Sequence, residues 1–279
     1  MSVDPSEDMD RFVRLRAFLG TEGFLRLQGA FVTVIGLGAV GGYATEALAR
    51  AGIGRLRLVD FDRVRPSNFN RQILALQGNV GRFKTEAARE RISQINPDCQ
   101  VEALTLFAHK DTLDRLLAGP PSLVVDAIDG LNPKAELLAE LSRRGIPVVS
   151  SMGAALRKDP TLVRVGPLSK TKECPLARRL RKRLRGLHVD LDRITCVYSI
   201  EPMDERARAA IGDQPDNDDE THGRTRRPLG SLPTMTGIFG LTCAHVAIQM
   251  LIHEAPSPSP PGIEDSSQKG CGLRGLPLQ

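Results

Sequence analysis

A glycine-rich turn near the start of the chain limits the possible folds more than any other feature. A short apolar run at residues 32–35 leads directly into the pattern G-x-G-x-x-G, and residues 43–51 after it are rich in helix formers. The glycines are Gly36, Gly38, Gly41 and Gly42. This order predicts a buried strand, a tight turn and a helix, in which backbone N–H groups can approach a phosphate because no Cβ intervenes. A tight turn without a ligand has the same pattern, so the residues that follow must show whether this turn binds a phosphate.

The next apolar run, residues 56–60, predicts a second strand that ends in a carboxylate. Asp60 lies about two dozen residues after Gly36, where dinucleotide-type folds place the acid that binds a ribose. Asp62 follows two residues later. We therefore expect Asp60 to bind ribose hydroxyls, and we count Asp62 among the nucleotide-binding residues.

The alternation of apolar runs and helical patterns up to residue 150 predicts the fold class. Further strands are expected at residues 101–106, 122–129 and 146–150, and helices at residues 80–95, 111–117 and 133–144. Such alternation is typical of an α/β fold with a Rossmann-like, mostly parallel sheet and helices on both faces.

Charged residues gather where these strands end. Asp126 and Asp129 close the fourth predicted strand, at the edge where open α/β sheets bind ligands. Lys84 lies in the first turn of the 80–95 helix, where a cation opposes the helix dipole, so we expect a bound phosphate to hold it. Residues 63–80 form a long connection, and long ordered connections in such folds are usually functional.

The pattern changes after residue 150, and a smaller C-terminal strand and helix region is expected to extend the fold. It contains short strands at 162–165 and 192–200, a basic helix at 170–186 and an apolar helix at 233–254. The cations of the basic helix are Lys170, Lys172, Arg178, Arg179, Arg181, Lys182, Arg183 and Arg185. This density of one sign favours an anionic partner, nucleic acid above all, over a merely solvated surface.

The composition predicts one folded domain with polar segments at its ends and inside it. We expect a single domain over residues 11–254, with a nucleotide-binding core at 11–150 and a substrate region at 151–254. The segments predicted to be disordered, because they are polar or rich in Pro, Ser and Gly, are residues 1–10, 203–230 and 255–279.

Composition also argues against several classes of protein. No apolar run is as long as a membrane span, and residues 1–10 lack the apolar core of a signal peptide, so we expect a cytoplasmic protein without membrane contact. None of the five cysteines forms a C-x-x-C pair, so neither zinc nor disulfides are expected. Only 4% of residues are aromatic and Trp is absent, which argues against a base-stacking platform for single strands.

Five motifs together resemble the ThiF/MoeB/ubiquitin-activating enzyme superfamily. They are the glycine turn and residues 58–62, 70–72, 80–84 and 126–129. The resemblance implies an enzyme that adenylates a carboxylate with ATP and Mg²⁺. It implies that Arg71 and Lys84 contact the phosphates and that Asp129 holds Mg²⁺. It also implies that Asn70 and Gln72 support the phosphate site.

In this superfamily an arginine from the partner subunit's N-terminal helix also reaches the phosphates. Arg14, in a helix expected over residues 11–27, stands at the matching place, which implies a homodimer with two composite sites. The expected catalytic residues are Arg14, Arg71, Lys84 and Asp129, the last also as the metal ligand. The expected cofactor-binding residues are Gly36, Gly38, Gly41, Gly42, Asp60, Asp62, Asn70, Gln72 and Asp126.

Further motifs in the chain resemble one branch, the tRNA threonylcarbamoyladenosine dehydratases. They are residues 92–99, 168–171, 175–181, 196–201 and 236–240. This resemblance implies that the threonine carboxylate of the modified adenosine is adenylated and that the group then cyclises with loss of AMP. The basic helix at 170–186 would contact the tRNA. Because the nucleophile is intramolecular, no catalytic cysteine is required, although Cys174 and Cys196 are candidates to lie near the site.

Three alternatives remain at this point. An enzyme that adenylates the C-terminal glycine of a ubiquitin-like sulfur carrier would share every ATP residue. An NAD-dependent oxidoreductase would share the glycine turn and Asp60, but it leaves Arg71, Lys84 and Asp129 unexplained. A non-catalytic tRNA- or protein-binding module is disfavoured by the same three residues. The sequence leaves open whether a monovalent cation binds and whether a cysteine desulfurase system is a partner.

Overall fold

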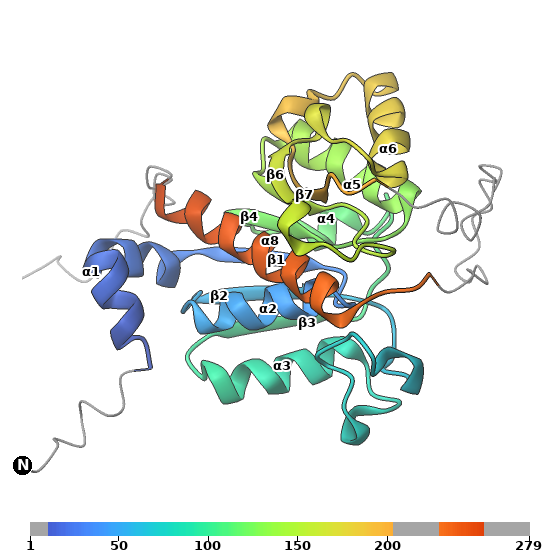
Figure 1. The fold of residues 1–279 in the computed structure, drawn as a ribbon. Coiled ribbons are helices and arrows are strands. Elements are labelled where there is room, and N and C mark those ends of the chain that lie inside the picture. The colour runs from blue at the N-terminus through green and yellow to red at the C-terminus, as the bar shows by residue number, and fades with distance from the viewer. Residues whose placement is uncertain (1–10, 203–228, 254–279) are drawn as a thin grey trace, which may run out of the picture.

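A computed structural model describes residues 11–202 and 229–253. A seven-stranded sheet with the order β3-β2-β1-β4-β5-β7-β6 forms its centre (Figure 1). All neighbouring strands are parallel except β6 and β7. The strands are β1 Phe31–Ile35, β2 Arg55–Val59, β3 Gln100–Leu104, β4 Leu123–Asp126, β5 Val148–Ser151, β6 Val163–Pro167 and β7 Thr195–Ser199. The predicted α/β class is confirmed, and strands from both halves of the chain join one sheet.

Helices cover both faces of this sheet. They are α1 Val13–Gly29, α2 Gly41–Arg50, α3 Lys84–Ile95, α4 Leu113–Leu116, α5 Leu131–Arg144, α6 Pro175–Gly186 and α8 Pro233–His253. One hydrophobic cluster joins the sheet to α1, α2, α3 and α8, and a second joins it to α4, α5 and α6. Because both faces are covered, all residues of β1, β4 and β5 are buried, as continuous apolar runs require in parallel sheets.

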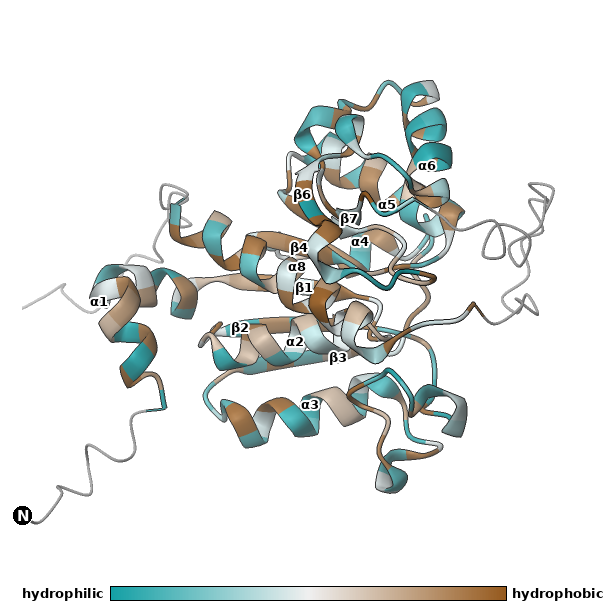
Figure 2. Ribbon diagram, viewed as in Figure 1, coloured by the Kyte–Doolittle hydropathy of each residue, from teal (hydrophilic) through white to brown (hydrophobic). Residues whose placement is uncertain are grey.

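Helix α8 is apolar along most of its length (Figure 2). By length and composition alone it could cross a membrane. It packs instead against α2 and β5 and buries Met235, Phe239 and Cys243, as a core helix of a folded domain does.

Several predicted boundaries change, for local reasons. The basic helix begins at Pro175, not at residue 170, because Cys174 caps it and Pro175 occupies its first turn. The fourth strand ends at Asp126, so Asp129 lies in the loop before α5. Helix α3 begins at Lys84 rather than at residue 80. Of the segments predicted to be disordered, residues 1–10 and 255–279 and all of 203–230 except its last two residues lie outside the described residues.

Candidate active site

The glycine turn connects β1 to α2 in a space that excludes larger residues. Gly36 has a φ of +89°, and a Cβ there would lie 2.8 Å from the carbonyl oxygen of Ala127. A Cβ on Gly41 would lie 1.7 Å from the carbonyl oxygen of Gly36. The space beside Gly38 is open, with no heavy atom within 4 Å of its Cβ position. The turn therefore packs tightly on its inner side and leaves room at the start of α2, where helix N–H groups can bind an anion.

Asp60 fastens the end of β2 to this turn. Its Oδ2 accepts a hydrogen bond from the Leu37 N–H at 2.7 Å, and its Oδ1 accepts one from the Asp62 N–H at 2.8 Å. The side chain is buried, and burial raises the pKa of Asp60 above its ordinary value, against the opposing effect of Lys84. Asp60 thus shapes the turn, and its binding of ribose stays a prediction.

Lys84 is held by carboxylates in this structure. Its side chain is 5% exposed, and Nζ lies 2.8 Å from Oδ2 of Asp62 and 4.0 Å from Oδ2 of Asp60. In this structure the carboxylate of Asp62 neutralises the cation, and contact of Lys84 with a phosphate stays a prediction. Lys84 and Asp62 therefore stand together at the end of β2, beside the glycine turn.

Arg71 lies in the connection between β2 and α3. Its Nη1 donates to Oδ1 of Asn70 at 2.8 Å and to the carbonyl of Ser67 at 3.1 Å. Gln72, the next residue, is buried. The side chains of Asn70 and Arg71 are thus already joined, which steadies the guanidinium group in this connection.

Asn68 organises the same connection and was not expected from the sequence. Its Oδ1 accepts the Arg65 N–H at 3.1 Å, and its carbonyl accepts the N–H groups of Arg71 and Gln72 at 3.1 and 2.9 Å. The signal that could have identified it is an asparagine two residues after Pro66, a combination typical of tight turns.

The two acids after β4 have different environments. Asp129 is exposed in the loop before α5. Asp126 is fully buried, where it pairs with Nζ of Lys134 at 2.7 Å and accepts a hydrogen bond from Ser150 Oγ at 2.7 Å. The oxygens of Asp126 are thus engaged by protein groups, unlike those of a direct nucleotide ligand. Lys134 was not expected from the sequence. It could have been identified as a lysine at helical spacing with Leu138 and Leu141, on the buried side of α5.

An aromatic pair and an open groove border the acids. The rings of Phe61 and Phe107 meet edge to face with centroids 5.0 Å apart. A groove of about 510 Å³ beside Asp62 is lined by Phe61, Asp62, Arg63, Val64, Arg65, Pro66, Val80, Gly81 and Phe83. Within it the guanidinium group of Arg63 stacks on the Phe83 ring, 3.7 Å from its centroid.

Arg14 does not join the other expected residues within one chain. Helix α1 leads directly into the start of β1, whereas the other site residues follow the strands' carboxyl ends (Figure 1). Arg14 is exposed on α1. Lys84 and Asp129 follow the carboxyl ends of β2 and β4 in the sheet, and Arg71 lies in the β2–α3 connection, whereas Arg14 lies on α1.

The two candidate cysteines, Cys174 and Cys196, are buried, as is Cys243. Burial raises the pKa of Cys196 and raises that of Cys243 to about 12, so neither is a thiolate near neutral pH. The Cys174 Sγ caps α6 by accepting the Ala177 N–H at 3.5 Å. Among residues 11–202 and 229–253, no group of three His, Cys, Asp or Glu could hold a metal ion.

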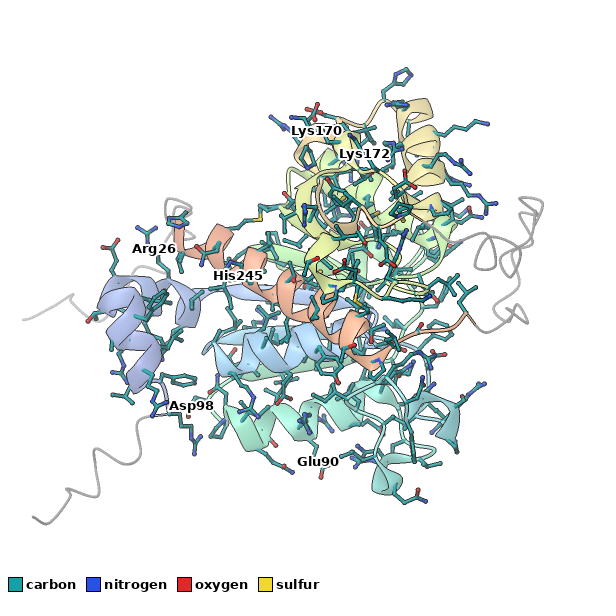
Figure 3. All side chains as sticks on the ribbon, in the orientation of Figure 1. Arg26, Glu90, Asp98, Lys170, Lys172 and His245 are labelled. Carbon is teal, nitrogen blue, oxygen red and sulfur yellow. The ribbon has the colours of Figure 1, made fainter. Side chains whose placement is uncertain are left out.

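Helix α6 has a buried leucine face and an exposed basic face. Leu180 and Leu184 are buried, and the helix is hydrophilic on its outer side (Figure 2). Lys170 and Lys172 lie beside it at one end of the molecule, away from Arg26 and Asp98 (Figure 3). The helix begins next to the end of β5, because a Cβ on Gly153 would lie 3.6 Å from Cys174 Sγ. The exposed cations of α6 are Arg178, Arg179, Lys182, Arg183 and Arg185.

Comparison with known proteins places the chain in a family. The model of the ThiF family matches residues 9–266. The chain belongs to the ThiF family. Within it, the chain is 36% identical over 246 residues to the tRNA threonylcarbamoyladenosine dehydratase of Bacillus subtilis, which covers 87% of this chain and 95% of that relative. The Escherichia coli dehydratase is also 36% identical, over 263 residues that cover 88% of this chain and 94% of the relative.

Solved structures of a dehydratase are similar to this chain over nearly the same length. The E. coli dehydratase TcdA in complex with ATP superposes with a TM-score of 0.77 at 34% identity, over 90% of this chain and 97% of that one. A TcdA complex with AMP gives a TM-score of 0.76. A Salmonella molybdopterin-synthase adenylyltransferase is 39% identical, but only over 150 residues, 54% of this chain and 59% of the relative. Similarity over nearly the whole length therefore runs to the dehydratases.

Proposed function

We propose that this protein adenylates the threonine carboxylate of threonylcarbamoyladenosine in tRNA with ATP and then dehydrates the group to a cyclic form. The observation that carries the proposal is the similarity to the dehydratases along nearly the whole chain. The molybdopterin-synthase adenylyltransferase, by contrast, matches only 54% of this chain.

The chemistry needs two steps. A carboxylate oxygen attacks the α-phosphorus of ATP, the bond to the β-phosphate oxygen breaks, and pyrophosphate leaves. The neighbouring urea group then attacks the activated carbonyl, and AMP leaves with its bonding electrons. In total the threonylcarbamoyl group of the tRNA loses one water molecule. The elements of that water are taken up as ATP is converted to AMP and pyrophosphate.

The site residues have roles that fit these steps. Negative charge grows on the α-phosphate, so fixed cations aimed at it lower the barrier. Arg71, steadied by Asn70, and Lys84 would supply those cations. The open space beside Gly38, at the start of α2, would accept the phosphates.

Magnesium fits one residue of the site. The exposed carboxylate of Asp129 is a hard oxygen donor of the kind that Mg²⁺ prefers, and it follows the strand next to the glycine turn. Asp129 would hold the ion, which neutralises phosphate charge when bound. Binding of a monovalent cation, a cysteine desulfurase partner and a cytoplasmic location stay predictions.

A composite site in a homodimer is supported by the position of α1. Arg14 lies on the helix that leads into the start of β1, away from the strands' carboxyl ends (Figure 1), and α1 exposes Val13, Phe18 and Leu25. Such an apolar surface suits burial against a second copy, which would bring the partner's Arg14 to this chain's phosphates.

Isotope exchange tests the proposal against its alternative. The protein is incubated with Mg-ATP and radiolabelled pyrophosphate, together with threonylcarbamoyl-tRNA, unmodified tRNA or a sulfur-carrier protein. Exchange stimulated by threonylcarbamoyl-tRNA alone is the expected result, with mass spectrometry showing loss of one water from the nucleoside. Exchange stimulated only by the carrier would replace the proposal by the adenylyltransferase reaction.

A further inference from the structure

A buried ion pair lies beneath the candidate site. The side chains of Lys134 and Asp126 are both 0% exposed, with Nζ 2.7 Å from Oδ2. Ser150 Oγ donates to the same oxygen at 2.7 Å. Removing two charges from water often costs as much as their attraction returns, so such a pair is weak evidence of a purely stabilising role.

Both charged groups hold the backbone of one loop residue. The Ile128 N–H donates to Oδ1 of Asp126 at 3.1 Å, and Nζ of Lys134 donates to the Ile128 carbonyl at 3.0 Å. Lys134 comes from α5 and Asp126 from the end of β4. The loop between these elements is therefore fixed through the backbone N–H and the backbone carbonyl of Ile128.

Ile128 lies between the two parts of the site. Ala127, before it, packs against the glycine turn: its carbonyl oxygen would lie 2.8 Å from a Cβ on Gly36, and its own Cβ 3.2 Å from one on Gly41. Asp129, after it, is the expected ligand of Mg²⁺. A shift of Ile128 would thus change the distance from the carboxylate to the phosphate-binding turn.

We propose that Lys134 is a positioning residue that, through Asp126 and the Ile128 carbonyl, sets the place of Asp129 relative to the glycine turn. The inference rests on the proposed function, because that function gives Asp129 its task. Lys134 is fully buried and touches no reacting group. Outer residues that orient a ligand typically change metal affinity or activity about 10- to 100-fold when removed.

The test removes the charges together, so that neither remains buried alone. Lys134→Met with Asp126→Asn keeps the shape of both side chains, and the asparagine oxygen can still accept the Ile128 N–H. The matched control is Arg57→Met with Glu102→Gln. Arg57 is also buried and paired, and it donates to the carbonyls of Leu116 and Ala118, before the start of β4.

Three measurements are compared after thermal unfolding has shown that the variants fold. We expect faster hydrogen exchange at residues 128–130 in the Lys134 double variant. The Mg²⁺ concentration for half-maximal ATP binding should rise about 10- to 100-fold. The kcat of pyrophosphate exchange should fall by a similar factor, with KM for tRNA unchanged. The control should match the wild type in all three.

The inference is overturned if the double variant shows the same hydrogen exchange at residues 128–130 and the same Mg²⁺ requirement as the wild type. If that variant does not fold, it is replaced by Lys134→Arg, which keeps the charge but changes the length and shape of the side chain. Hydrogen exchange and the Mg²⁺ requirement then test the inference in the same way. Absence of tRNA-stimulated exchange in the wild type would reject the proposed function instead, whereas hydrogen exchange at residues 128–130 would still decide the role of Lys134.

Discussion

At the scale of single residues, the site depends on close packing that leaves no room for another atom. The clearest contrast is between Gly41, whose Cβ would meet a carbonyl oxygen at 1.7 Å, and Gly38, whose Cβ would meet nothing within 4 Å. The same chemical change at these two positions should therefore act on different properties of the protein.

Gly41→Ala should lower the free energy of unfolding by about 1–3 kcal/mol, because the backbone must move to admit the methyl group. Gly38→Ala should leave it within about 0.5 kcal/mol and weaken ATP binding, since the methyl group would enter the space meant for phosphate. Urea denaturation and ATP titration measure the two effects. Equal loss of stability in both variants would show that the two positions are packed alike.

Asp60 permits a prediction with a defined pH dependence. Asp60→Asn should lower the free energy of unfolding at pH 7 by about 1–3 kcal/mol, since the amide can accept only one of the two N–H groups without rearrangement. Burial raises the pKa of Asp60 in the folded state, so the folded state binds the proton more tightly. The wild type should therefore gain stability relative to Asp60→Asn as the pH falls through that pKa.

Denaturation curves of both proteins at pH 7 and at pH 4 measure that difference. Other carboxylates titrate alike in the two proteins and cancel. A difference that shrinks or stays constant toward low pH would show that the pKa of Asp60 is not raised.

At the scale of elements, α6 combines structural and exposed cations. Arg181 donates to the carbonyl of Thr171 at 2.8 Å, and Arg183 donates to Oδ1 of Asn132 at 2.7 Å. These two arginines fasten the helix to its surroundings. Arg178, Lys182 and Arg185 form an exposed stripe at helical spacing, so they are better tests of tRNA binding.

Replacing Arg178, Lys182 and Arg185 by Gln should weaken tRNA binding and leave ATP binding unchanged. For every tRNA phosphate that the variant no longer neutralises, the slope of log K against log salt should become shallower by about 0.7 to 0.9. Titrations at several salt concentrations measure this slope. A control with the same change in net charge replaces Arg89, Lys110 and Arg115, which are exposed elsewhere, and an equal effect of both triple variants would reject a specific role for α6.

At the scale of the whole molecule, a composite site predicts complementation between defective subunits. Arg14→Ala and Arg71→Ala should each inactivate the homodimer. A mixed dimer would have one site with both arginines intact, so random mixing should restore about one quarter of the wild-type activity. Activity assays before and after subunit exchange measure the recovery, and no recovery despite confirmed exchange would show that Arg14 does not act at the partner's site.

The overall fold could be predicted because its signals are local and repeated. The glycine turn, the alternation of elements and the acids at the strand ends all depend on short stretches of sequence. The Lys134–Asp126 pair could not be predicted so directly, because only the packing of α5 on the sheet shows that the lysine points inward. The start of α6 was missed because basic residues before Pro175 continue the charge pattern without continuing the helix.

The pairing of Lys84 with Asp62 has a consequence for turnover. A carboxylate of the same chain neutralises this cation, so an incoming phosphate must displace that carboxylate from Lys84. Breaking the Lys84–Asp62 pair lowers the net free energy that is gained when ATP binds. It also leaves Asp62 ready to recapture the lysine once pyrophosphate forms, so the same pair that moderates the affinity for ATP should hasten the departure of the product.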